Sequence, residues 1–264
     1  LIELICVNVQ GEIPCLIYAI SLNNKIEVEE HQVPCIFYFL KRKVKMRKDV
    51  FNFSITNNLE TVGKFDMPKV QAFSPGQLKC QFLLATPFNH ALTETQPESK
   101  ICHFYIDDYQ FERVWREPGA YVELLKKFNA VIGADFSMYL NMPKPQQMYN
   151  CWRNKVLMAY WQKQGVNVIP NIQWSDEKSF EYCFDGIDPG GVVSVCSTGC
   201  HNKESKQLFL AGFDRMKQIL NPEKIICVGV LPKELQADEK IIQINSFMEE
   251  RRKQWAEEEV GLDK

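Results

Sequence analysis

After Lys100, short apolar runs alternate with longer segments whose apolar residues recur every three or four positions. Strands that alternate with helices predict parallel pairing through right-handed crossovers, because a tight turn cannot join parallel neighbours. The pattern therefore predicts an α/β domain over residues 100–247 with a mostly parallel sheet of about six strands. The predicted strands are Ile101 to Ile106, Ala130 to Ala134, Val166 to Ile169, Val192 to Cys196, Ile225 to Val230 and Ile241 to Ile244.

Helical spacing is clearest in two of the intervening segments. Apolar residues from Phe209 to Leu220 recur at intervals of four and three, and Asn221-Pro222 then ends the helix. Met148 to Ala159 forms a similar stripe, which Gly165 ends at the C-cap. Crossover helices of this kind fit either an open doubly wound sheet or a partial barrel completed by part of residues 65–90.

The remaining chain divides into three segments of different character. Residues 46–99 contain many turn residues and few apolar runs, so we expect an irregular segment packed on the main domain. Residues 248–264 read as a charged, exposed helical tail. Residues 1–45 precede the first Met, and Lys43-Val44-Lys45 is compatible with the codons AAG-GTG-AAA, which resemble a bacterial ribosome-binding site. They are either an untranslated leader read in frame or a variable N-terminal extension.

Composition indicates the cellular setting of the protein more clearly than its function. Lys plus Arg number 31 against 33 Asp plus Glu, so charge does not favour nucleic acid, although a local patch remains open. The ten cysteines are spread through predicted strands and helices, which is typical of reduced thiols in a cytoplasmic protein. The apolar runs Ile13 to Ile20 and Val33 to Leu40 are too short to span a bilayer. The oligomeric state stays open.

Polar residues follow most of the predicted strands. Carboxyl ends of parallel strands carry the ligand sites of α/β folds, because their loops lead into helix N-termini with free N–H groups. Asp108 and Asp135 would serve there as acid, base or metal groups. Asn171 would orient the ligand, and Arg153 would reach an acidic group or pair with a carboxylate. The anion-binding loop would consist of Ser197, Thr198 and Gly199, which as a plain turn would only cap a helix.

Structural roles explain other residues at these ends. Asp107 has Gln110 three positions later, which is the spacing of a capping box, and Ser175 reads as an N-cap. Cys196 and Cys200-His201 have spacing that weakly resembles a zinc site, and Cys200 with a histidine is a weak candidate nucleophile. No Gly-x-Gly-x-x-Gly or Walker motif occurs. The sequence specifies no cofactor.

Several segments together resemble one family of phages, plasmids and bacterial chromosomes, catalogued as domain of unknown function 4417. The resemblance covers most of residues 46–244, and it suggests a mobile-element setting with no established activity. Two departures are Ala134, where the family usually has Pro, and Val230-Leu231, where a small polar turn is common. The second departure disfavours a ligand role for that strand end. The segments are Phe104 to Trp115, Asp135 to Ser137, Trp152 to Asn154, Val168 to Asn171, Phe180 to Gly186 and Ser197 to Cys200.

Taken together, these features predict an enzyme or binder of a phosphorylated or nucleotide-like small molecule that uses strand-end acids. The alternative is a non-catalytic accessory protein that binds a host or replication partner, which predicts an exposed apolar patch and no concave polar pocket. A replication-associated DNA-binding protein is a third possibility, but only residues 41–48 are dense in Lys and Arg.

Overall fold

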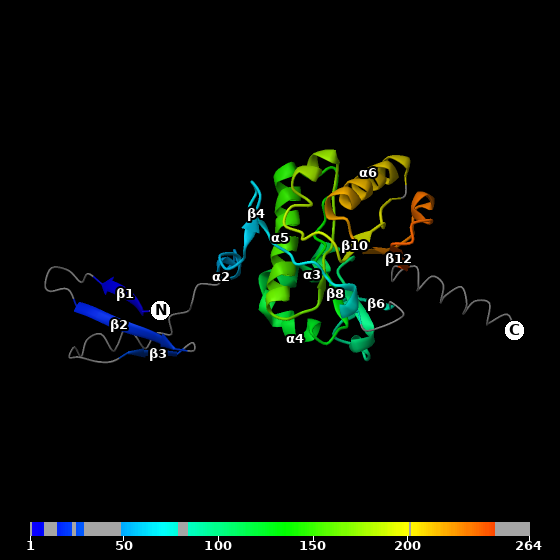
Figure 1. Cartoon of the computed structure of the whole chain (residues 1–264). Coiled ribbons are helices and arrows are strands. Elements are labelled where there is room, and N and C mark those ends of the chain that lie inside the picture. The colour runs from blue at the N-terminus through cyan, green and yellow to red at the C-terminus, as the bar shows by residue number, and fades with distance from the viewer. Residues whose placement is uncertain are drawn as a thin grey trace. The chain divides into compact units, whose positions relative to one another are not determined.

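The computed structural model describes residues 2–7, 15–22, 25–28, 49–78, 84–200 and 202–245, the first three ranges by their backbone alone. The chain divides into two units, residues 1–48 and 49–264. In the first unit, β1 (Ile2–Val7) pairs antiparallel with β2 (Cys15–Leu22), which pairs antiparallel with β3 (Lys25–Val28) (Figure 1). The leader and the tail fall largely outside the described residues, so both remain predictions.

The second unit begins with short elements before its main sheet. Helix α2 (Phe53–Thr56) is followed by an antiparallel pair, β4 (Thr61–Val62) and β5 (Met67–Pro68), and by the 3-10 helix η1 (Pro75–Gln77). Val70 and Phe73 then make isolated bridges to Ile187 and Val192. The segment therefore packs on the α/β body through backbone hydrogen bonds as well as buried side chains.

Among the described residues, seven parallel strands form the body, where about six were expected, and they lie in two sheets. The extra strand, β6, comes from residues 65–90, the segment that the partial-barrel alternative required. The four-stranded sheet contains β6 (Leu84–Pro87), β7 (Lys100–His103), β8 (Ala130–Ile132) and β9 (Val168–Ile169), and the three-stranded sheet contains β10 (Val192–Cys196), β11 (Lys224–Val228) and β12 (Ile241–Ile244).

A parallel bridge between Asn171 and Ser194 joins the two sheets at β9 and β10. Ile172 N donates to Ser194 O at 2.8 Å, and Ser194 N donates to Pro170 O at 2.8 Å. The strands therefore follow one another in chain order from β6 to β12. A doubly wound sheet reverses its strand order at a switch point, so the observed order corrects that alternative in favour of the partial barrel.

The two faces of these strands belong to two separate cores. One core is shared by alternate residues of the strands, as the two-residue period of a strand requires: Ile101, Ala130, Ile132, Ile169, Val192, Ile226, Val228 and Ile244, with Phe73 added from the preceding segment. The other core contains the intervening strand residues and the helices that cover them. The first core fills the inner side of the curved sheet.

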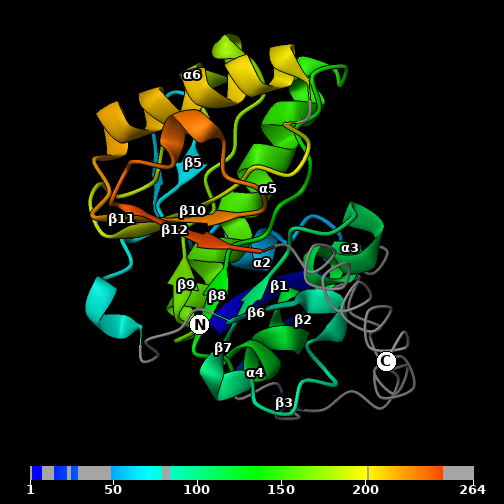
Figure 2. The same ribbon diagram turned by 90° about the vertical axis from the view of Figure 1, so that its right-hand side faces the viewer.

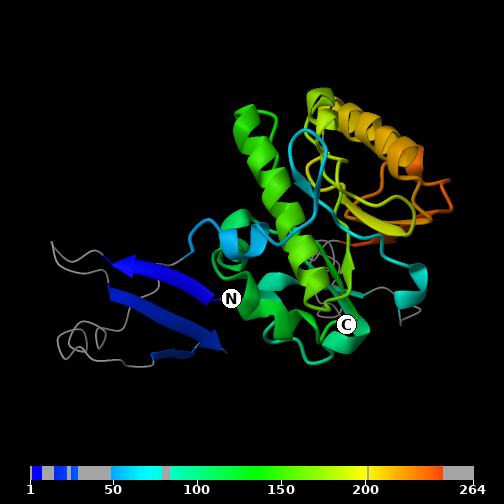
Figure 3. The same cartoon turned by 60° about the vertical axis from the view of Figure 1, so that its left-hand side comes forward.

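Four helices of four residues or more connect the strands within the described part of this body. They are α3 (Asp108–Arg116), α4 (Val122–Leu125), α5 (Lys144–Lys163) and α6 (Lys203–Leu220), with 3-10 turns η2 (Phe88–His90), η3 (Pro97–Ser99), η4 (Pro118–Tyr121), η5 (Glu177–Glu181) and η6 (Lys233–Leu235). Figures 2 and 3 both show α6 along β10–β12 and α5 running across the body. No helix in the described ranges combines the length and apolarity needed to cross a membrane.

The apolar stripe predicted in α6 is confirmed. Phe209, Phe213, Met216 and Leu220 are all buried, and the helix ends at Asn221, whose φ of 40° is left-handed. Burial of four large side chains on one face contributes most of what holds this helix on the sheet, at roughly 1.5–3 kcal/mol per side chain. The helix start is thereby fixed beside the loop that follows β10.

Candidate functional site

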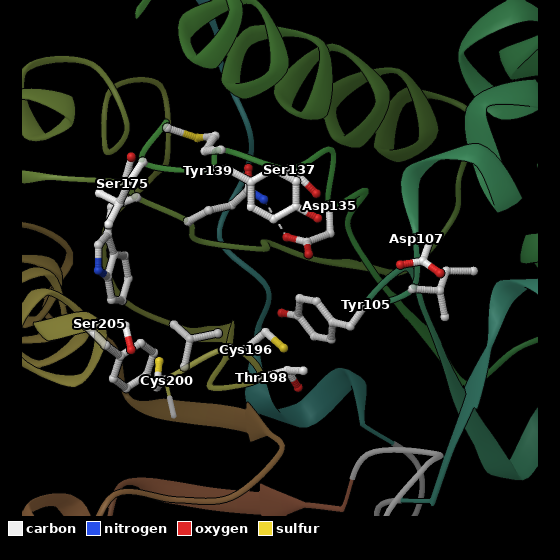
Figure 4. Close-up of a pocket in the computed structure, with 18 of the residues that line it drawn as sticks. Tyr105, Asp107, Asp135, Ser137, Tyr139, Ser175, Cys196, Thr198, Cys200 and Ser205 are labelled. Carbon is white, nitrogen blue, oxygen red and sulfur yellow. Dashed lines mark hydrogen bonds between the residues drawn. The ribbon is translucent and has the colours of Figure 1, made fainter. Parts of the chain in front are cut away.

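A cavity of about 1030 Å³ opens at the carboxyl ends of five strands, β6 to β10 (Figure 4). Its size suits a small organic molecule. The loops after those strands line it together with the first turns of α6, whereas β11 and β12 contribute no lining residue. The place that the sequence predicted for the site is therefore hollow, and the strand end at Val230, disfavoured from the sequence, lies outside the cavity.

Asp135 is the central charged residue of this cavity. Its Oδ1 accepts a hydrogen bond from Asn171 Nδ2 at 2.8 Å and another from Gln173 Nε2. Figure 4 shows the other carboxylate oxygen directed into the cavity. Desolvation by burial raises the pKa of Asp135 to about 6, against the lowering effect of the two amide donors, and nearby Asp108 adds a smaller rise. The carboxyl group therefore changes charge near neutral pH.

Asn171, predicted to orient a ligand, is hydrogen-bonded to three protein groups. It is buried and does not line the cavity. Its Nδ2 also donates to Ala134 O at 2.9 Å, and its Oδ1 accepts from the Tyr105 hydroxyl at 2.9 Å. The amide thus holds Asp135 and Tyr105 in a fixed relation.

Tyr105 extends this network to the next strand. Its hydroxyl lies 2.8 Å from Ser194 Oγ, which also reaches Ile226 O at 3.1 Å. Burial and the negative charge of Asp135 raise the pKa of Tyr105, so the phenol stays protonated and continues to donate to Asn171. Strands β7 to β11 are thereby tied together by side chains just beneath the cavity.

Gln173 is held from behind by a second amide. Asn154 Nδ2 on α5 donates to Gln173 Oε1 at 2.6 Å, and Asn154 Oδ1 accepts from Phe136 N at 2.9 Å. Because the Gln173 carbonyl is already occupied, its Nε2 must point toward Asp135. The orientation of the carboxylate therefore depends on α5 as well as on the strand ends.

Substituting Asn171 by Ala should raise the pKa of Asp135 above its value of about 6. The variant removes a donor that favours the charged carboxylate while burial stays in place. Titration of the Asp135 carboxyl carbon by NMR in both proteins measures the shift. An unchanged or lower pKa would show that the amide does not stabilise the charge.

Asp108 is close enough to Asp135 to affect its pKa, but its hydrogen bonds are to Ser137. Both its carboxylate oxygens accept from Ser137 N at 3.2 Å, and Oδ1 accepts from Ser137 Oγ at 2.8 Å. It therefore ties the start of α3 to the loop after β8, and it does not line the cavity. Among the described residues, no three His, Cys, Asp or Glu side chains converge as a metal site would require.

The three residues predicted to form an anion-binding loop after β10 lie in different surroundings. Thr198 and Gly199 line the cavity, but Ser197 is buried and its Oγ lies 3.3 Å from Val228 O on β11. Gly229 follows β11 with φ of 107°, and an added Cβ would lie 2.8 Å from Ser197 Oγ. A glycine at this end of β11 therefore allows the loop to approach closely.

Arg153, the last predicted ligand residue, lies away from the cavity. Its Nη1 contacts both carboxylate oxygens of Glu112, at 3.0 and 3.2 Å, and its Nε donates to Asn150 Oδ1 at 3.0 Å. The guanidinium carbon lies 3.4 Å from the centroid of the Phe136 ring. Of the two roles open for Arg153 in the sequence, pairing with a carboxylate is the observed one.

Two predicted helix caps are wrong in detail. Asp107 occupies the N-cap position of α3 without a capping hydrogen bond from its side chain, and the carboxylate instead borders the cavity. In η5 the cap is Asp176, which accepts from Ser179 N, whereas Ser175 is buried with no partner for its Oγ among the described residues. Both predicted caps thus belong to the cavity lining.

The two cysteines near the cavity are poor nucleophiles. Burial raises the pKa of Cys196 to about 12 and that of Cys200 to about 11, so both remain thiols at neutral pH. His201, which the zinc and nucleophile interpretations used, lies outside the described residues. His103 is buried, which lowers its pKa to about 4 and leaves it neutral.

The geometry defines an α/β protein with a partial barrel and a polar cavity at the carboxyl ends of its strands. Comparison with known proteins places it further: the chain belongs to the family described as Domain of unknown function (DUF4417), which matches residues 59–247. The resemblance seen in the sequence is thereby confirmed.

Two phage proteins are among its relatives. The "Gene 1 protein" of Mycobacterium phage L5 is 30% identical over 184 residues, which cover 69% of this chain and 78% of that protein. The "Gene 1 protein" of Mycobacterium phage D29 is 33% identical over 164 residues, 60% of each chain. No solved structure matches. The relatives support the phage setting, but their names state no activity, so the chemistry must be inferred from the geometry of the site.

Proposed function

We propose that this chain binds a small nucleotide-like or phosphorylated molecule in the cavity and that Asp135 acts on it as a proton acceptor. One observation carries the proposal: Asp135 has one oxygen fixed by two amides, one oxygen open to the cavity, and a pKa of about 6. A carboxylate that titrates near neutral pH is suited to take up and return a proton.

The surrounding residues have separate roles in this proposal. Asn171 and Gln173 position the carboxylate and do not take the proton. Thr198 and Gly199, which line the cavity near the start of α6, would offer a hydroxyl and backbone groups to the polar part of the ligand. Asp108 acts on the site through Ser137 and through its charge. The six cysteines whose side chains the structure describes are free, which supports a reducing, cytoplasmic setting.

A thermal-shift screen of small bacterial metabolites against the wild type and Asp135→Asn tests the proposal. Asn keeps an acceptor for the two amides but has no charge and takes up no proton. At least one compound should raise the melting temperature of the wild type and leave the variant unchanged. The proposal is contradicted if no compound raises the melting temperature of the wild type, or if the same compound raises that of the variant equally.

A second candidate function is the accessory role in which the protein binds another protein. It is favoured by three exposed apolar side chains around α2, where Val50 is 67%, Phe51 66% and Phe53 58% exposed. The Phe51 and Phe53 rings lie 5.5 Å apart. This alternative also predicted the absence of a concave polar pocket, and the cavity at the strand ends stands against that part of it.

A further inference from the structure

We infer that the site recognises an aromatic nitrogen heterocycle with N–H groups, as in a nucleobase, and that it does not recognise a phosphate. The inference rests on the proposed small-molecule role of the cavity and narrows its ligand class. Three independent features of the lining carry it: its charge, its aromatic wall and the polar groups that are open to the cavity.

The charge of the lining opposes a phosphate. Its only charged side chains are the carboxylates of Asp107 and Asp135, and no Lys or Arg lines the cavity among the described residues. Lys206, one turn into α6, is paired with Glu234 at 2.7 Å. Phosphate groups in proteins are held by charge-assisted hydrogen bonds from Arg or Lys. A phosphate in this cavity would instead meet two like charges in a partly desolvated space.

One wall of the cavity offers a flat aromatic surface. Trp174 lies 5.5 Å from Phe209, ring centroid to ring centroid, and its Nε1 donates to Leu208 O at 3.2 Å. The indole rests on α6 at Gly212, where an added Cβ would lie 2.2 Å from Trp174 Nε1. Because the ring is held by a hydrogen bond and by packing, it loses little freedom when a ligand ring stacks on it.

The polar groups open to the cavity match the edge of a heterocycle. The open oxygen of Asp135 accepts an N–H, and the ring nitrogens and exocyclic amines of nucleobases provide such donors. Thr198 is exposed at the other side of the lining and carries a hydroxyl. A hydroxyl both donates and accepts, so it suits a ring edge that carries both kinds of group.

Calorimetric titration at pH 7 with the four ribonucleosides, their 5′-monophosphates and inorganic phosphate tests the inference. At least one nucleoside should bind, and its monophosphate should bind several-fold more weakly because of the two carboxylates.

Asp135→Asn and Trp174→Ala should each weaken nucleoside binding by about 10-fold or more. Asp107→Asn should bring the monophosphate closer to the nucleoside. Asp214→Asn, which removes an exposed carboxylate of α6 outside the lining, is the control and should change nothing.

A short single-stranded oligonucleotide forms the last arm, because an exposed base in a strand has the same ring chemistry. Tighter binding of the free nucleoside than of the strand supports a small-molecule ligand, and the reverse overturns it. Tighter binding of phosphate or of the monophosphates also overturns the inference. If the nucleosides fail but another metabolite binds in an Asp135-dependent way, the ligand class is wrong and the proposed function stands.

Discussion

Raising the pH from 4 to 7 should lower the free energy of unfolding through Asp135 by up to about 3 kcal/mol. The folded pKa of about 6 exceeds the unfolded value of 3.8, so between these values the native state binds more protons than the unfolded state. Stability contributed by the protonated carboxyl is present at low pH and is lost as the pH rises through about 6. A shift of about two pKa units at 1.36 kcal/mol per unit gives the magnitude.

Asp135→Asn isolates this contribution from those of other groups. Wild type and variant should have similar free energies of unfolding at pH 4, and the variant should be more stable at pH 7. Urea unfolding at a series of pH values measures the difference, with Asp214→Asn as the exposed control. If the free energies of unfolding of the wild type and Asp135→Asn change with pH in parallel, Asp135 has the same pKa in the folded and unfolded protein. This result would contradict its proposed role as a proton acceptor.

A gain of stability on removing Asp135 would itself indicate function. A half-buried carboxylate with one oxygen open to a cavity destabilises the fold at neutral pH, and a purely structural residue would not be expected to do so. Active sites commonly carry such groups, because the chemistry needs a charge where folding alone would not place one. The pH profile therefore tests both the ionisation of Asp135 and the reason for its presence.

The strand periodicity predicted the location of the site better than its residues. Parallel strands bring their carboxyl ends to one edge, so the alternation of strands and helices was enough to place the cavity. Asp135, Thr198 and Gly199 line the cavity, and each lies within three residues of the end of its strand. Neighbouring positions in a loop differ in direction, however, and this is why the lining includes Asp107 where Asp108 was expected.

Tyr105, Gln173 and Ser194 were missed, although the two-residue period of a strand contained a signal for two of them. Ile101 faces the inner core, so two and four residues later His103 and Tyr105 fall on the same side. Ser194 lies two residues after the inner residue Val192. A polar residue at an inward position near the end of a strand was the pattern to look for. The partnership of Gln173 with α5 depends on tertiary packing, and no local pattern predicts it.

Arg153 provides the second large expected effect, and it separates a structural from a ligand-binding role. Arg153→Leu should lower the free energy of unfolding by about 3 kcal/mol, because it removes the charge-assisted hydrogen bonds of a buried guanidinium together with its packing on Phe136. The partner, Glu112, would lose both contacts to the guanidinium, and Phe136 would lose the cation above its ring. Urea unfolding of the wild type and the variant measures the loss.

Glu112→Gln is the matched variant, since an amide oxygen in place of a carboxylate still accepts from Arg153 Nη1. It should cost less than Arg153→Leu, because the guanidinium keeps a hydrogen-bond acceptor and its packing on the Phe136 ring. Folded Arg153→Leu protein should bind the wild-type ligand with unchanged affinity, because the guanidinium does not line the cavity. If Arg153→Leu keeps the stability of the wild type but loses ligand binding, the result contradicts the structural role. Arg153 would then contact the ligand, as the sequence first suggested.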